Sequence, residues 1–119
     1  MASDDTFTAV VPKQVEEDPA FTIWESDVAT SLLERVEAAR EKIESEGVIT
    51  SAKDLTDGLY EKKWKSGLRL YFAVIEKHGK KTLLLLGSGK GKDQDRAIKK
   101  SREILKSYVV VKESIAKKD

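Results

Sequence analysis

The sequence predicts a small single-domain α+β protein in which an antiparallel sheet of about four strands has N-terminal helices packed on one face and a C-terminal helix. A length of 119 residues suits one domain. Apolar residues recur every three or four positions over residues 26–46, which indicates an amphipathic helix. Three β-type segments between residues 59 and 86 are separated by short turns, and short turns join antiparallel neighbours. Residues 1–119 therefore form one domain, with flexible tails expected at about 1–6 and 112–119.

The N-terminal region is predicted to begin with one strand. Residues 7–11 alternate and include β-branched side chains, and Pro12 ends this strand. An acidic loop or the start of a short helix follows over residues 13–20. The apolar side chains of Phe21, Ile23 and Trp24 are then expected to anchor a short first helix to the core.

The clearest element is the helix predicted over residues 26–46. Ser26 suits the N-cap and Asp27 suits the positive first turn, while Gly47 is a natural stop. The apolar face of this helix consists of Val28, Leu32, Val36, Ala39 and Ile43. The opposite face is mostly acidic, so it is either solvated or turned toward a basic partner.

The remainder of the chain is predicted to form a three-stranded meander and a last helix. A connector over residues 48–58 leads to strands at about 59–65, 68–75 and 82–86. The turns contain Ser66-Gly67 and His78-Gly79. A glycine-rich turn at 87–91 precedes a helix near 93–108. Residues 109–111 either extend that helix or form one more short strand.

The net charge of +1 conceals a division along the chain. Residues 1–57 carry a formal charge of −9 and residues 58–119 carry +10. Such asymmetry favours an anionic partner for the second half, although two solvated faces that balance would give the same numbers. The chain has no cysteine, which excludes disulfides and thiolate chemistry. No apolar run is long enough to span a membrane and no basic leader is present, so we expect a cytoplasmic protein that does not bind membranes.

Two local motifs are ambiguous. The only histidine, His78, lies in a lysine-flanked loop and is more often inert than catalytic in such a position. The segment Gly87–Asp93 fails the spacing of a phosphate-binding P-loop. It could still bind an anion through backbone N–H groups with Lys90 and Lys92 beside it, or it could be a flexible turn with Asp93 as the helix cap.

The meander carries the main candidate site. Strand alternation places Lys63 and Lys65 on one face of the first strand, and Arg69 and Tyr71 on one face of the second. Cations that follow phosphates, together with a ring that stacks on a base, are typical of single-stranded RNA binding. A solvated outer sheet face would also explain these lysines.

Four blocks resemble, in order and at compatible spacing, the RelE/ParE superfamily of bacterial toxins, in particular the addiction-module killer branch related to HigB. The family patterns are L-x-x-G-L/V-x-E-L-R, G-Y-R-V-Y-F, L-L-L-C-G-G-x-K and Q-x-x-D-I-x-x-A. The corresponding segments here are Asp54–Trp64, Gly67–Phe72, Leu83–Lys90 and Gln94–Ser101. The second position of the G-Y-R block is Leu68, which departs from the pattern.

The resemblance implies a twisted antiparallel sheet with helices on one side, and a toxin of a type II toxin–antitoxin system that a cognate antitoxin protein inhibits. RelE-like members cleave mRNA on the ribosome by attack of the ribose 2′-OH on the adjacent phosphate, with no metal and no cofactor. Arg69 matches the arginine of the G-Y-R block and Lys63 replaces the arginine of the E-L-R block, so both are expected to be catalytic. The residues expected to bind RNA or phosphate are Lys65, Lys90, Lys92 and Tyr71.

A non-catalytic function on the same fold stays open. RelE itself uses a tyrosine late in its last helix, and this chain has no clear counterpart of that tyrosine there. The chain is also not strongly basic overall. A gyrase inhibitor of the ParE kind, or an inactive homologue that only binds a partner, is the alternative.

Overall fold

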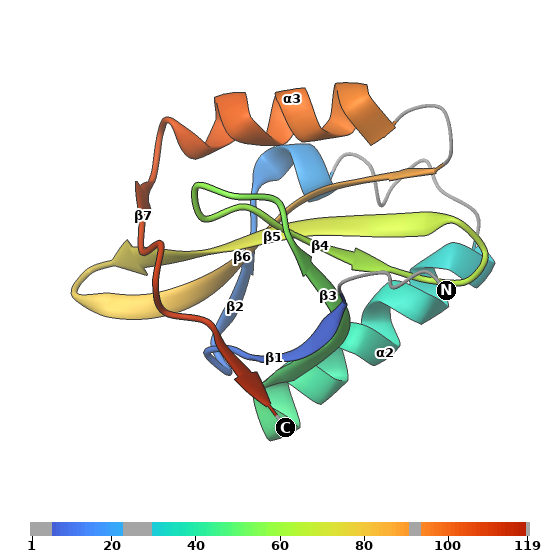
Figure 1. Ribbon diagram of the computed structural model, residues 1–119, viewed down its shortest axis with the longest axis horizontal. Helices are drawn as coiled ribbons and strands as arrows, with labels where there is room; N and C mark the ends of the chain where they lie inside the picture. The colour runs from blue at the N-terminus through green and yellow to red at the C-terminus, as the bar shows by residue number, and fades with distance from the viewer. Residues whose placement is uncertain (1–5, 23–29, 91–93, 119) are drawn as a thin grey trace.

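The computed structural model (Figure 1) describes residues 6–22, 30–90 and 94–118. In this part of the chain the main feature is an eight-stranded sheet, accompanied by two helices with defined bounds and a helical turn at residues 19–22. The helices are α2 (Thr30–Glu46) and α3 (Gln94–Leu105). The strands are β1 (Phe7–Val10), β2 (Val15–Glu17), β3 (Val48–Asp54), β4 (Tyr60–Lys63), β5 (Leu68–Lys77), β6 (Lys80–Lys90), β7 (Val109–Val110) and β8 (Ala116–Lys118).

The sheet is built around the long β5–β6 hairpin. Its strand order is β2-β6-β5-β4-β3-β1-β8, and β7 pairs with the second half of β5. Most neighbours are antiparallel, but β2 runs parallel to β6, so the sheet is mixed. The hairpin turn has positive φ at both His78 (52°) and Gly79 (77°), which is the requirement of a two-residue turn matched to strand twist.

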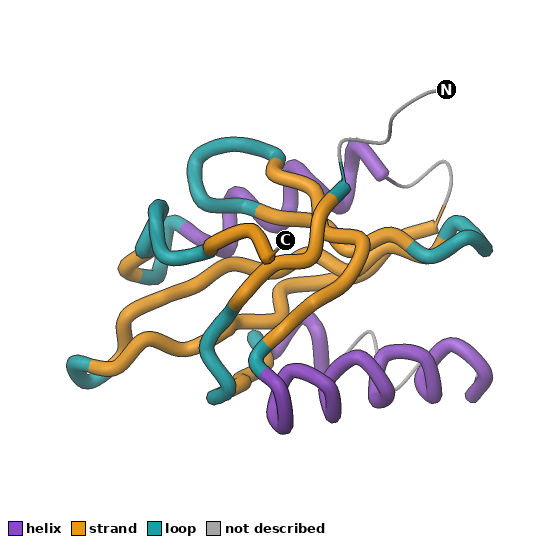
Figure 2. The backbone as a smooth tube through the Cα atoms, turned by 60° about the horizontal axis from the view of Figure 1, so that its bottom comes forward, coloured by secondary structure: helices purple, strands orange, loops and turns teal. Residues whose placement is uncertain are grey.

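The helices cover opposite faces of the sheet (Figures 1 and 2). Val36 and Ile43 of α2 belong to a core cluster with Phe72 and Leu85. On the other face, Leu105 of α3 packs in a second cluster that includes Leu84. The β5–β6 hairpin is therefore buried on both sides, and its alternate residues supply two separate cores.

The prediction of about four antiparallel strands with the helices on one face is wrong. Four of the eight strands have only two to four residues and lie outside the expected meander, namely β1, β2, β7 and β8. Of these, β1 was expected and β7 was one of two alternatives, whereas β2 and β8 were not expected. Segments so short give almost no periodic signal. The segment expected as a connector forms β3, which pairs with both β1 and β4. The continuous apolar runs in residues 70–75 and 83–86 are typical of strands covered on both faces, in agreement with the position of α3 opposite α2.

Several local predictions are confirmed. The strand at residues 7–11 is β1, and the three-stranded antiparallel meander is β4–β5–β6. The C-terminal helix is α3, and the ambiguous valines form β7. The long helix ends at Glu46, and Gly47 follows with φ of 70° while its N–H donates to the Ile43 carbonyl at 2.8 Å. The expected N-cap at Ser26 and the anchors at residues 23 and 24 lie outside the described residues.

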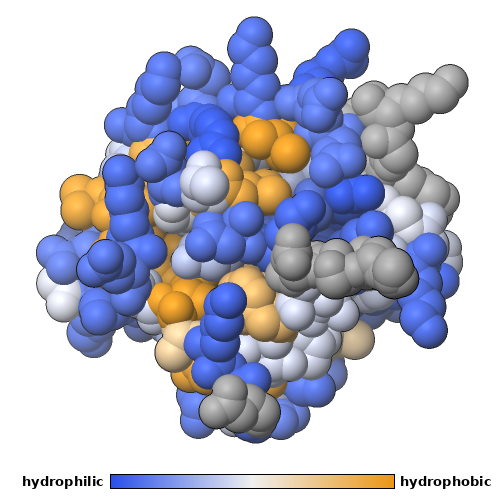
Figure 3. Space-filling view, in the orientation of Figure 1, coloured by the Kyte–Doolittle hydropathy of each residue, from blue (hydrophilic) through white to orange (hydrophobic). Residues whose placement is uncertain are grey.

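The two ends of the described chain lie side by side in the sheet. Residues 112–119 are expected to be a tail, yet 116–118 form β8, which pairs with β1. The face seen in Figure 3 is largely hydrophilic, and its apolar patches are interrupted by charged side chains. No helix in the described residues is long and apolar enough to cross a membrane.

Candidate functional site

Strand register brings the sequence-predicted residues to one end of the β4–β5–β6 meander. Lys63 pairs with Arg69 across β4 and β5. Arg69 pairs in turn with Gly89 of β6, and the next pair toward that end is Leu68 with Lys90. We call the group formed by Lys63, Lys65, Arg69 and Lys90 the strand-end site. Its members come from segments up to 27 positions apart in the sequence, so only the pairing of the strands unites them.

Lys63 and Lys65 are the accessible cations of the strand-end site. Both side chains are exposed, and they line a shallow cavity of about 320 Å³ together with Thr6, Ser51 and Trp64. No carboxylate lines this cavity in the described residues. It therefore offers two ammonium groups to an anion.

Arg69 lies deeper and is held by a buried carboxylate. Its Nη1 donates to Oε1 of Glu61 at 3.0 Å, and the Glu61 side chain is only 1% exposed against 17% for Arg69. The remaining Oε2 of Glu61 and the Nε of Arg69 have no hydrogen-bond partner among the described residues. The guanidinium thus compensates a buried negative charge in addition to lying at the candidate site.

Tyr71 is completely buried beside this ion pair. Its side chain is 0% exposed, and within the described part of the chain its hydroxyl has no hydrogen-bond partner. Burial raises the pKa of the Tyr71 phenol well above its usual range, and the negative charge of Glu61 raises it further. The ring has no exposed face to offer to a base in this conformation, so it cannot serve as the stacking platform expected for RNA binding.

The glycine-rich segment is mostly strand, which corrects the prediction of a turn. Residues 87–90 complete β6, because Gly87 and Gly89 pair with the bulky Tyr71 and Arg69 of β5. A Cβ at Gly87 would also lie 3.9 Å from Oγ of Ser101 in α3. That separation is an ordinary van der Waals contact, so the packing of α3 does not itself require glycine at this position. The side chain of Lys90, and Lys92 with the rest of the expected turn, lie outside the described residues.

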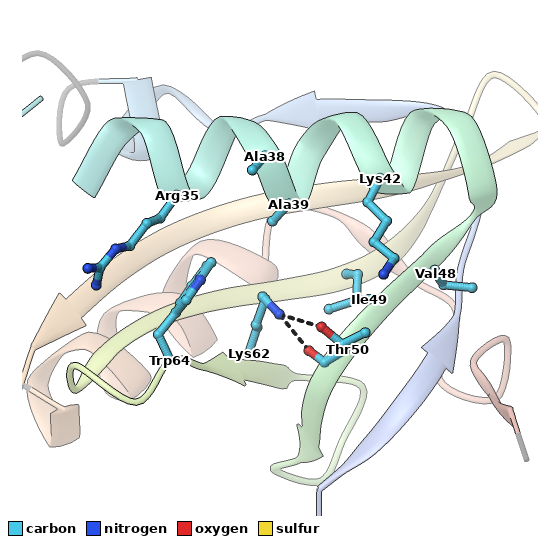
Figure 4. Close-up of a pocket in the computed structure, with 9 residues that line it drawn as sticks. All are labelled: Arg35, Ala38, Ala39, Lys42, Val48, Ile49, Thr50, Lys62 and Trp64. Carbon is cyan, nitrogen blue, oxygen red and sulfur yellow. Dashed lines mark hydrogen bonds between the residues drawn. The ribbon is translucent and has the colours of Figure 1, made fainter. Parts of the chain in front are cut away.

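A second cavity, which we call the α2 pocket, lies between α2 and the opposite face of the same sheet (Figure 4). Its volume is about 260 Å³. One wall is the stripe of α2 formed by Arg35, Ala38, Ala39 and Lys42, and the other wall comes mainly from Ile49, Thr50, Lys62 and Trp64. Trp64 lines both this pocket and the cavity beside Lys63 and Lys65.

Lys62 is fixed inside the α2 pocket. Its Nζ donates to the carbonyl of Thr50 at 2.8 Å and to Oγ1 of Thr50 at 2.9 Å, and it lies 4.9 Å from the centre of the Trp64 ring. The residue is only 8% exposed. Burial lowers the pKa of the Lys62 ammonium to about 8, and repulsion from Lys42 contributes to the same shift.

We expect Lys62 to make the fold more stable as pH rises from about 8 toward 10. In this range the unfolded chain keeps the Lys62 proton, since the ordinary pKa is 10.5, whereas the folded chain loses it near 8. The unfolded state then binds more protons, so the free energy of unfolding increases with pH. Urea midpoints at pH 7.5, 8.5 and 9.5 should show this rise in wild type and a smaller rise in Lys62→Met. Parallel pH profiles for the two proteins would contradict the assignment.

Sequence reasoning placed Lys62 and Trp64 on the same face of β4 but did not select them as site residues. Arg35 and Lys42 lie in the acidic half of the chain and are not among the predicted site residues. Their spacing of seven residues, with Ala38 and Ala39 between them, is the signal that places two cations on one helical stripe. What the sequence does not reveal is that this stripe faces Lys62 across a cavity.

Comparison with known proteins gives no relative for this arrangement. No family model matches the chain, and neither a curated protein nor a solved structure matches it.

Proposed function

We propose that the protein is the toxin of a type II toxin–antitoxin system and that it cleaves mRNA on the ribosome. The observation that carries the proposal is the strand-end site, where β4, β5 and β6 bring together Lys63, Arg69 and the backbone of Lys90. Three of the four sequence blocks that resemble the RelE/ParE toxins contribute a strand to this site. A cognate antitoxin protein is the expected partner, and action on the ribosome implies a cytoplasmic location.

In this proposal the site acts through fixed positive charge. Attack of a ribose 2′-OH on the adjacent phosphate builds negative charge on the phosphoryl oxygens, and cations stabilise that charge without needing a metal ion. The exposed ammonium of Lys63, with Lys65 beside it, is placed to contact the phosphate. Arg69 supplies a positively charged group behind them, held by Glu61.

A second candidate is a non-catalytic protein that binds gyrase or another partner. The buried geometry of two residues favours it: Tyr71 is inaccessible and Arg69 is already paired with Glu61. A supercoiling assay with purified gyrase separates the two candidates, since only the ParE-like function inhibits that enzyme.

Controlled expression of wild type is expected to arrest growth and to cut messages on ribosomes, and Lys63→Ala is expected to reduce cleavage at least tenfold. Lys63 is exposed, so its replacement removes a phosphate contact and leaves the core intact. Lys81→Ala, at an exposed position near the other end of β6, is the matched control and should cleave as wild type does. Intact growth and intact message with wild type would overturn the proposal, as would full cleavage by both Lys63→Ala and Arg69→Lys.

A further inference from the structure

The α2 pocket gathers three cations and no carboxylate. Arg35, Lys42 and Lys62 line it, and none of the three forms an ion pair with any described residue. Arg40, which is also on α2, is by contrast paired with both Glu17 and Glu44. Unpaired like charges that converge on a cavity repel one another, so an anion placed among them is stabilised.

One of these cations is held ready for a ligand. The Lys62 ammonium is fixed by its two hydrogen bonds to Thr50 and by the Trp64 ring, which leaves one of its three N–H donors without a partner in the described residues. Because the Lys62 side chain is already ordered, part of the entropic cost of binding an anion is removed. Lys42 is exposed on α2 and extends toward Lys62, whereas Arg35 lies at the other end of the pocket, beyond Trp64 (Figure 4).

The remaining walls suit a planar, partly apolar group. Trp64 is half-buried and lines the cavity. The small side chains of Ala38 and Ala39 leave space between α2 and the sheet at this point. An aromatic side chain next to a group of cations is the combination that recognises a nucleotide, because the ring stacks on the base while the charges bind phosphate. The volume of about 260 Å³ lies just below the usual range of small-molecule pockets, so it suits one nucleotide rather than a large cofactor.

We propose that the α2 pocket binds a nucleoside monophosphate unit, either free or within single-stranded RNA, with its phosphate between Lys42 and Lys62 and its base against Trp64. Arg35 neutralises further negative charge at the rim. The proposal does not depend on RNA cleavage, because the pocket lies on the sheet face opposite Arg69 and needs no reaction there.

Proton linkage gives the binding a second signature. A phosphate beside Lys62 offsets the repulsion from Lys42 and favours the charged ammonium, so binding takes up protons at a pH above the pKa of about 8. Affinity for the nucleotide should therefore be higher at pH 7 than at pH 9.

Fluorescence of Trp64 is the direct test. In a Trp24→Phe background Trp64 is the only tryptophan. Titration with adenosine 5′-monophosphate at pH 7 should give saturable quenching that is weaker at pH 9. Lys62→Met, and separately the Arg35→Ala/Lys42→Ala double variant, should weaken binding by about tenfold or more. Lys81→Met should leave it unchanged. The double variant alters only exposed side chains, so it keeps the test valid if Lys62→Met fails to fold.

A second arm identifies the source of the nucleotide. A short oligoadenylate that binds more tightly than the monophosphate, with the same loss in the double variant, indicates single-stranded RNA; equal affinity indicates a free nucleotide. Binding of neither probe would overturn the proposal. It would also be overturned if both probes bound the double variant as tightly as they bind wild type.

Discussion

Replacing Arg69 by alanine is expected to lower the free energy of unfolding by about 3–5 kcal/mol, because it leaves the charge of Glu61 buried without compensation. The Glu61 side chain is 1% exposed, and the contact from Arg69 Nη1 at 3.0 Å is its ion pair. Urea unfolding followed by circular dichroism measures the loss.

A paired replacement provides the control for this prediction. In Glu61→Leu/Arg69→Met both charges are removed together, so the buried charge disappears and much of the lost stability should return. A loss below about 1 kcal/mol in Arg69→Ala would contradict the structural function of the pair, since that is the range of an exposed salt bridge. The result also bears on catalysis: an inactive Arg69→Ala protein would be uninformative if it were unfolded, which is why Lys63→Ala is the better test of RNA cleavage.

Replacing Phe72 by alanine is expected to cost about 3–5 kcal/mol, the usual loss for a large aromatic side chain in a core. Phe72 is 0% exposed and lies between the sheet and α2. Its ring stacks on Tyr60 with centroids 5.8 Å apart, so truncation removes this contact as well as leaving a cavity.

Val109→Ala is the matched control for the core prediction. Val109 is 66% exposed in β7, so its truncation should change stability by less than about 0.5 kcal/mol. Equal urea midpoints for wild type and Phe72→Ala would show that the cluster around Phe72 does not stabilise the fold as the packing requires.

The sequence predicted the elements with strong local signals and missed those that depend on distant partners. The long helix and the meander have clear local signals, and both are present; the helix ends at Glu46 as expected, whereas β6 (Lys80–Lys90) is much longer than the strand expected at 82–86. Strands β2, β7 and β8 are two or three residues long and form only because a longer strand pairs with them. Local sequence patterns also do not show which face of the sheet α3 covers. The uninterrupted apolar run of Leu83–Leu86 does indicate that this strand is buried on both faces.

In the candidate sites, too, local patterns predict some features and miss those that depend on distant parts of the chain. Alternation along β4 correctly separates Lys62 from Lys63, and pairing with β5 places Lys63 beside Arg69. The burial of Tyr71 could not be predicted, because its cover comes from α3 rather than from its own strand neighbours. Charge summed over each half of the chain was misleading for Arg35 and Lys42. A helix sorts its side chains by angle, so an acidic segment can still carry a basic stripe.

The pairing of β1 with β8 has a practical consequence for work on the purified protein. Thr8 lies opposite Lys118, so affinity tags fused at either end would leave the sheet from the same edge. Thr6 lines the cavity that contains Lys63 and Lys65. A charged tag or linker joined directly before Thr6 would therefore lie beside these two lysines and shield them from an anion. Assays on this face require protein from which the tag has been cleaved.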